Sequence, residues 1–156
     1  MSLEPQVSFY NRTTNVDLSV SGWTVGTVKA SEESSVLALR VWNNRGGSEL
    51  ASSMQDCSLF ILDSLDGKSE PIVTGGWLKG KCLSLGDSSF IALDAVDVLE
   101  IGSQSHPTDT IIDGDINDGT DTNVSNFSDI DLKFVPAFGA THGLKNFSVA
   151  IKYFFV

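Results

Sequence analysis

The chain has 156 residues and a formal net charge of −10, from 20 acidic and 10 basic side chains. Its length suits one domain with its own core, and its 41% hydrophobic content excludes disorder of the whole chain. The excess of acidic groups repels phosphate backbones, so we expect no nucleic-acid partner.

The amino-terminal residues Met1-Ser2-Leu3-Glu4-Pro5 lack a basic region followed by an apolar one, so we see no secretory signal. We expect residues 1–3 to have no structural role. Further along, no apolar run approaches the roughly 20 residues needed to cross a bilayer, so we expect no membrane partner.

Short runs with a two-residue hydrophobic period, separated by turn residues, predict strands along most of the chain. In chain order the expected strands are 17–20, 23–28, 35–42, 57–62, 71–74, 77–85, 90–93, 96–99 and 147–155. The strand at 57–62 is apolar on both sides, which predicts a central position. The run at 71–74 begins with a proline, which favours a sheet edge. The pattern predicts an all-β fold: one antiparallel β-sandwich domain spanning residues 1–156, either Ig-like or jelly-roll.

Two segments differ from this pattern of short strands. Residues 102–128 are rich in Asp, Asn, Gly, Ser and Thr, with a short apolar centre at Ile111-Ile112. We interpret them as a long surface excursion or a poorly held hairpin. The carboxyl-terminal run 147–155 is strongly apolar, and we expect it to be docked in a sheet because it would otherwise aggregate.

The excursion and the residues after it are acidic enough to raise the question of calcium. Seven aspartates lie within 23 residues: Asp109, Asp113, Asp115, Asp118, Asp121, Asp129 and Asp131. Calcium takes six to eight oxygen ligands, and residues 113–119 resemble the start of an EF-hand loop. Position six is Asp118 instead of Gly, however, and position twelve is Val124 instead of Glu. We therefore favour a solvated loop without metal, and calcium binding by Asp113, Asp115 and Asp118 stays open.

Candidate catalytic groups are few. His106 and His142 lie in turn-like stretches, and the chain has no G-x-S-x-G or H-E-x-x-H motif. An acidic pair such as Asp113 and Asp115 would suggest a hydrolase only if it faced a deep pocket. We therefore expect no catalytic residue and no cofactor, and a protein that is not an enzyme.

Cys57 and Cys82 lie outside any C-x-x-C motif, and we interpret them as buried free thiols, although neighbouring strands would let them pair. The three tryptophans are candidates for a sugar-stacking platform, but positions within or beside strands favour the core. These are Trp23, Trp42 and Trp77. Four N-x-[ST] sequons, at Asn11, Asn123, Asn126 and Asn146, reflect a composition rich in Ser and Thr.

The motif Val41-Trp42-Asn43-Asn44-Arg45-Gly46-Gly47 and positions after it resemble a group of phage and prophage virion proteins from Gram-positive hosts. The later positions are Met54, Asp56-Cys57, Trp77, Asn117-Asp118-Gly119-Thr120, Asn126-Phe127, Val135-Pro136, Gly143, Phe147 and Tyr153. The resemblance covers residues 20–156, and the Trp-Asn-Asn-x-Gly-Gly block is its most specific part.

This resemblance implies a non-enzymatic tail- or baseplate-type structural protein, assembled in the bacterial cytoplasm and located in the virion. Its expected partners are other copies of itself, as a homo-oligomer, or other virion proteins. Long polar loops are where binding concentrates, so Arg45-Gly46-Gly47 and the excursion are the candidate contacts. The alternative is a carbohydrate- or surface-binding β-sandwich module, calcium-dependent in one version, with an exposed tryptophan.

Overall fold

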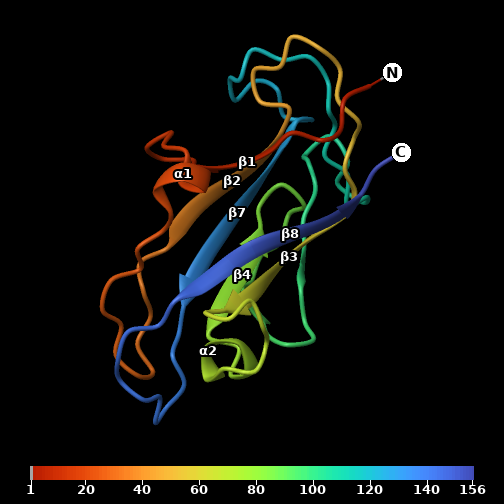
Figure 1. The fold of residues 1–156 in the computed structure, drawn as a ribbon. Coiled ribbons are helices and arrows are strands. Elements are labelled where there is room, and N and C mark those ends of the chain that lie inside the picture. The colour runs from red at the N-terminus through yellow and green to blue at the C-terminus, as the bar shows by residue number, and fades with distance from the viewer. Residues whose placement is uncertain (1) are drawn as a thin grey trace.

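Eight strands form two antiparallel sheets packed face to face in the computed structural model, which describes residues 2–156 (Figure 1). The larger sheet contains, in spatial order, β1 (Val7–Asn11), β2 (Leu37–Asn43), β7 (Phe127–Phe134), β4 (Leu78–Cys82) and β5 (Ile91–Leu93). The smaller sheet contains β6 (Leu99–Glu100), β3 (Gln55–Asp63) and β8 (Phe147–Phe154). This arrangement confirms the predicted all-β class and the antiparallel β-sandwich.

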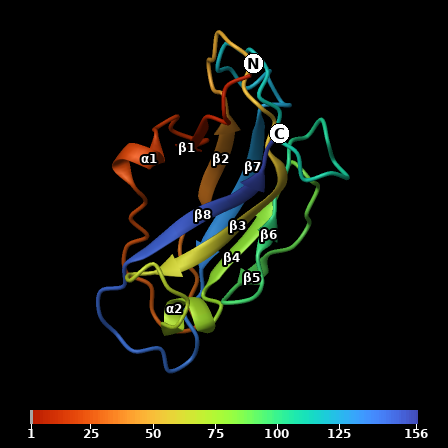
Figure 2. The ribbon, with the colours of Figure 1, turned by 45° about the vertical axis from the view of Figure 1, so that its right-hand side comes forward.

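The core lies between the sheets because alternate side chains on each strand point inward. On β2 the inward residues are Leu37, Leu39 and Val41, and β3 contributes Leu59 and Ile61 from the opposite sheet. The predicted central position of β3 is confirmed, since it pairs with β6 on one side and β8 on the other (Figure 2).

β7 was missed in the sequence, although it lies at the centre of the larger sheet between β2 and β4. Its outward positions include Asp129 and Asp131, which made the segment resemble the end of the acidic excursion. β1 was missed as well. Leu3, ahead of β1 in the chain, forms a parallel bridge with Ala51, so the expectation that residues 1–3 have no structural role is wrong for Leu3. Met1 lies outside the described residues.

Two of the expected strands are wrong, because each is a single helical turn. Residues 17–20 lie largely in α1 (Leu18–Ser21), where the Asp17 carboxylate accepts a hydrogen bond from the Ser19 N–H and caps the turn. Residues 71–74 form α2 (Pro71–Thr74), with proline at a position where helices tolerate its missing N–H. A two-residue period over four residues cannot separate these alternatives.

The structure also differs from the sequence-based expectation in two further strands and in the excursion. Residues 23–28 form no strand, and the strand expected at 96–99 is reduced to β6. The excursion is not poorly held: Ile112 forms an antiparallel bridge with Met54, and both side chains are fully buried. Neither helix among residues 2–156 is long and apolar enough to cross a membrane.

Candidate functional site

Buried asparagine side chains hold the Trp-Asn-Asn-x-Gly-Gly block against the excursion. The Asn44 amide donates to the carbonyl oxygens of Glu49 at 2.8 Å and Gly114 at 2.9 Å. The Asn117 side-chain oxygen accepts from the N–H of Gly46 at 2.8 Å, while its amide donates to the Asn44 carbonyl at 2.6 Å. These bonds satisfy backbone groups that would otherwise be buried without partners.

Two glycines are needed where these segments meet. A Cβ at Gly47 would overlap the Asn44 amide, and a Cβ at Gly114 would overlap the Ala51 carbonyl. Arg45 stacks over the Tyr10 ring at 4.1 Å and donates to the Asn15 side-chain oxygen. The block therefore has a structural role within the chain, and its contact with neighbouring molecules stays a prediction.

Two of the three aspartates considered for calcium, Asp113 and Asp118, bind separate partners, and Asp115 is exposed. Asp113 accepts from Ser53 and lies 2.9 Å from the His106 ring nitrogen. Asp118 accepts from the Thr120 hydroxyl and from the Asn123 amide within its own loop, and the Thr120 bonds lead in holding its pKa below the ordinary value. Among residues 2–156, no group of three or more His, Cys, Asp or Glu side chains is arranged to hold a metal ion.

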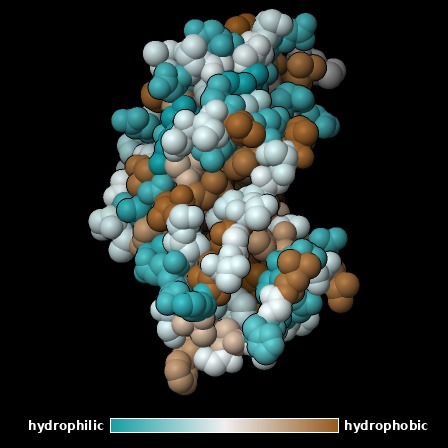
Figure 3. Space-filling model, turned by 90° about the vertical axis from the view of Figure 1, so that its left-hand side faces the viewer, coloured by the Kyte–Doolittle hydropathy of each residue, from teal (hydrophilic) through white to brown (hydrophobic). Residues whose placement is uncertain are grey.

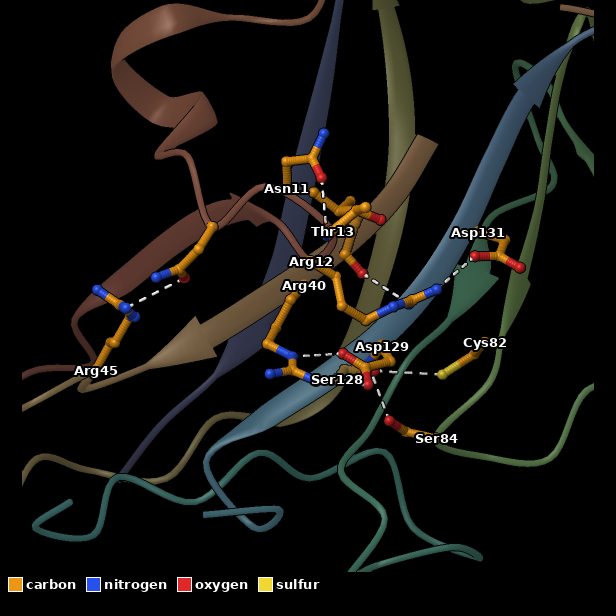
Figure 4. Close-up of polar contacts among 12 residues, drawn as sticks. Asn11, Arg12, Thr13, Arg40, Arg45, Cys82, Ser84, Ser128, Asp129 and Asp131 are labelled. Carbon is orange, nitrogen blue, oxygen red and sulfur yellow. Dashed lines mark hydrogen bonds and ion pairs between the residues drawn. The ribbon is translucent and has the colours of Figure 1, made fainter. Parts of the chain in front are cut away.

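The remaining aspartates of the cluster include two on β7 that pair with arginines across the outer face of the larger sheet (Figure 4). Arg40 binds Asp129 through two nitrogens, at 2.6 and 2.9 Å, and lies 3.8 Å over the Phe127 ring. Arg12 binds Asp131 at 2.9 Å. Such ion pairs fix strand register and side-chain orientation on this face.

Neither histidine occupies the position that the imidazole has in a catalytic triad. In a triad the imidazole stands between the nucleophile and the acid. Here Asp113 stands between Ser53 and His106, so the ring does not contact the hydroxyl that it would have to deprotonate. His142 lies exposed in the β7–β8 loop.

The cysteines are free and buried, as the sequence predicted. Burial raises the pKa of Cys57 to about 12 and raises that of Cys82 above its ordinary value, so both remain thiols near neutral pH. The Cys82 sulfur lies 3.3 Å from the Ser128 hydroxyl oxygen, which also accepts from the Gly102 N–H. Both thiols therefore belong to the packed interior.

The tryptophans do not form an exposed platform. Trp77 is 6% exposed and belongs to the core, whereas Trp42 is 2% exposed but lies on the outer face of β2, where Phe127 packs against it at 4.7 Å. Trp23 is half-buried against Phe134 and Phe147, at 5.5 and 5.6 Å. The alternative of a sugar-binding module loses its proposed stacking surface.

The outermost strands of the two sheets differ in whether their free edges are covered by other parts of the chain. The outer edge of β1 is covered, since the Phe9 N–H donates to the Ser19 hydroxyl and the Asn11 N–H to the Val16 carbonyl. β5 and β6 have only three and two residues. β8 has eight residues and pairs with β3 alone, so its other edge runs uncovered among the described residues (Figure 2).

Exposed apolar residues lie at both ends of β8. Phe154 is 58% exposed and Val156 100%, while Phe138 is 95% exposed in the loop that leads into the strand. Figure 3 views the side where α1 and this loop lie and shows apolar side chains among polar ones across that face. We refer to β8 and residues 155–156 as the carboxyl-terminal edge, and it is the candidate interaction site.

Comparison of the chain with known protein families, curated proteins and solved structures finds no match. Sequence reasoning predicted that the last strand is docked in a sheet, and this is confirmed by its pairing with β3. It did not identify the free edge, because edge status depends on which strand lies alongside.

Proposed function

We propose that the chain is a non-enzymatic structural subunit that works by assembly, as a tail- or baseplate-type component of a phage virion. The observation that carries the proposal is the uncovered eight-residue edge of β8, in a sandwich whose other strand edges are covered or very short.

Uncovered edges present backbone N–H and C=O groups that pair readily with another strand, and natural proteins usually protect them. Where a long edge stays open, strand addition by a partner is the recognition mode that uses it. The apolar residues Phe154, Phe155 and Val156 continue from the same strand and favour a contact that removes them from water.

The virion class is supported by the resemblance carried by the Trp-Asn-Asn-x-Gly-Gly block. Within the chain, Asn44 of that block binds the Gly114 carbonyl, and the N–H of Gly46 binds the Asn117 side chain. The partners that follow are other copies of the chain or other virion proteins.

The test is whether the chain is part of a particle. Particles released from the host strain would be purified on a density gradient and analysed by mass spectrometry, with a cytoplasmic host protein as the contamination control. We expect the chain to band with the particles at a constant ratio to the major virion proteins. Recovery only in the soluble fractions at the top of the gradient would contradict the virion function.

A second measurement separates the proposal from the calcium-dependent alternative. Light scattering on a sizing column, first with calcium and then with chelator, reports the oligomeric state. We expect an oligomer of unchanged size in both conditions. An association that requires calcium would instead favour the surface-binding module.

A further inference from the structure

We propose that β8 is the contact between two copies of this chain: two β8 strands pair antiparallel across a twofold axis and join their three-stranded sheets into one of six strands. This inference rests on the proposed assembly function and specifies the partner and the register.

The backbone groups available at the edge follow from the neighbouring strand. The Cys57 carbonyl accepts from the Ile101 N–H, so this residue of β3 directs its backbone toward β6. Because backbone direction alternates along a strand, Ser58, Phe60 and Leu62 face β8. The β8 residues opposite those three are Lys152, Ala150 and Ser148.

The other residues of β8 therefore direct their N–H and C=O groups outward. They are Phe147, Val149, Ile151 and Tyr153. Among residues 2–156, no backbone bond outside the β3–β8 ladder reaches these groups. The outward groups alternate along the strand as an antiparallel partner requires.

Side-chain chemistry selects the partner and the register. A twofold axis at Ala150 places Val149 opposite the partner's Ile151 and Phe147 opposite the partner's Tyr153, all on the inward face. These side chains are only partly buried in the single chain, so the partner strand covers apolar surface. A twofold axis at Lys152 would oppose two lysines directly, which is unfavourable.

The charges of the carboxyl-terminal segment are compatible with self-association through this strand. All 20 acidic residues lie before residue 135, together with eight of the 10 basic residues. Residues 135–156 contain Lys145 and Lys152 and no Asp or Glu. Two copies of a chain with a net charge of −10 that meet at this segment therefore bring together two stretches without an acidic side chain.

Cross-linking tests the register. In the Ala150→Cys variant the two Cβ atoms lie about 5 Å apart across the axis, within reach of a disulfide after small adjustment. Ser148→Cys is the matched control on the same face, because its two copies lie about 13 Å apart in this register. We expect the first variant to form a covalent dimer about tenfold faster than the second under mild oxidation.

Hydrogen exchange tests the same contact without a substitution. As the protein concentration rises, the N–H groups of Val149, Ile151 and Tyr153 should exchange at least about tenfold more slowly. Those of Ser148, Ala150 and Lys152, already bonded to β3, should not change with concentration. This readout stays valid if either cysteine variant fails to fold.

Three outcomes would overturn the inference: a monomer at about 0.1 mM, equal cross-linking of both variants, or an oligomer in which the outward N–H groups stay unprotected. The last result would indicate a head-to-tail or mixed contact and would leave the virion function standing. A β8-paired dimer that never bands with particles would instead contradict the virion function and leave the twofold contact intact.

Discussion

The excursion at residues 102–128 and the carboxyl-terminal edge are opposites in composition and in how they are held. The excursion is polar and acidic, yet Asn117 and Asn126 are buried and its apolar centre at Ile112 is sealed against Met54. The carboxyl-terminal edge is apolar, yet β8 has no neighbour on one side and Phe154 reaches solvent.

The difference teaches that polarity alone does not locate a binding surface. A polar segment is held in place when its side-chain amides form hydrogen bonds with buried backbone groups. A buried polar group without a hydrogen bond would lower the stability of the fold. An apolar strand stays available when the sheet ends at it. The predictions below test whether the excursion is held by its internal hydrogen bonds and whether the carboxyl-terminal edge is available to a partner strand.

The largest expected loss of stability comes from removing the Trp42 ring, which is buried against Phe127 next to Asn43 and Asn44. Trp42→Ala removes the contact with Phe127 and the surface under Arg40, and should lower the free energy of unfolding by about 3–5 kcal/mol. Urea unfolding followed by fluorescence of the other tryptophans measures it. A loss below about 1 kcal/mol would show that the stability of the fold does not depend on this ring.

A smaller loss is expected from Asn44→Ala, which removes a side-chain donor from the buried Gly114 carbonyl. The free energy of unfolding should fall by about 1–3 kcal/mol, and amide exchange should accelerate in residues 113–119. Asn146→Ala, at an exposed position, is the matched control. If the two variants had equal stability and equal amide exchange, the excursion would not depend on the hydrogen bonds of Asn44.

Stability should also fall in acid because of Asp63, which accepts from four backbone N–H groups in the β3–α2 loop. These bonds, that from Gly67 first, hold its pKa below the ordinary value. A lowered native pKa stabilises the fold above the unfolded pKa of about 3.9, and this contribution is lost as the pH falls through the native value.

Asp63→Asn should therefore be less stable than the native chain at pH 7, with the difference shrinking as the pH falls below the ordinary carboxyl pKa of about 3.9. Thermal unfolding across this pH range measures the effect. Asp121→Asn, at an exposed aspartate, provides the reference. A difference that is constant with pH would show that the carboxylate charge is not what holds the loop.

The smallest effect on stability is expected at the open edge. Phe154→Ser should change the free energy of unfolding by no more than about 0.5 kcal/mol, because the ring is largely exposed. It should nevertheless weaken self-association, whereas Phe138→Ser in the β7–β8 loop should leave association unchanged. Sedimentation at several concentrations compares the two, and an equal effect would place the contact elsewhere.

Much of the fold was readable from hydrophobic alternation. The strands expected at 35–42, 57–62 and 147–155 correspond to β2, β3 and β8, since burial of one face imposes a two-residue period. α1 and α2 were not, because a single turn with Asp17 or Pro71 at its start is defined by capping rather than by periodicity.

The candidate site was less readable. The two acidic residues of β7 belong to the aspartate cluster considered for calcium, but Arg12 and Arg40, distant in sequence, form ion pairs with both of them. The glycines of the Asn-Asn block indicated a turn, but only the packed structure shows Asn117 reaching back to Gly46. Contacts over such separations leave no periodic signal in the sequence.

The sequence by itself determined the class of this protein: a β-sandwich with an apolar final strand and buried thiols, because alternation and burial are local consequences of side-chain chemistry. The tertiary structure decided which polar segment is sealed and which strand edge is left open. Both depend on strand order, and β8 is an edge only because the chain places β3 on one side of it and nothing on the other.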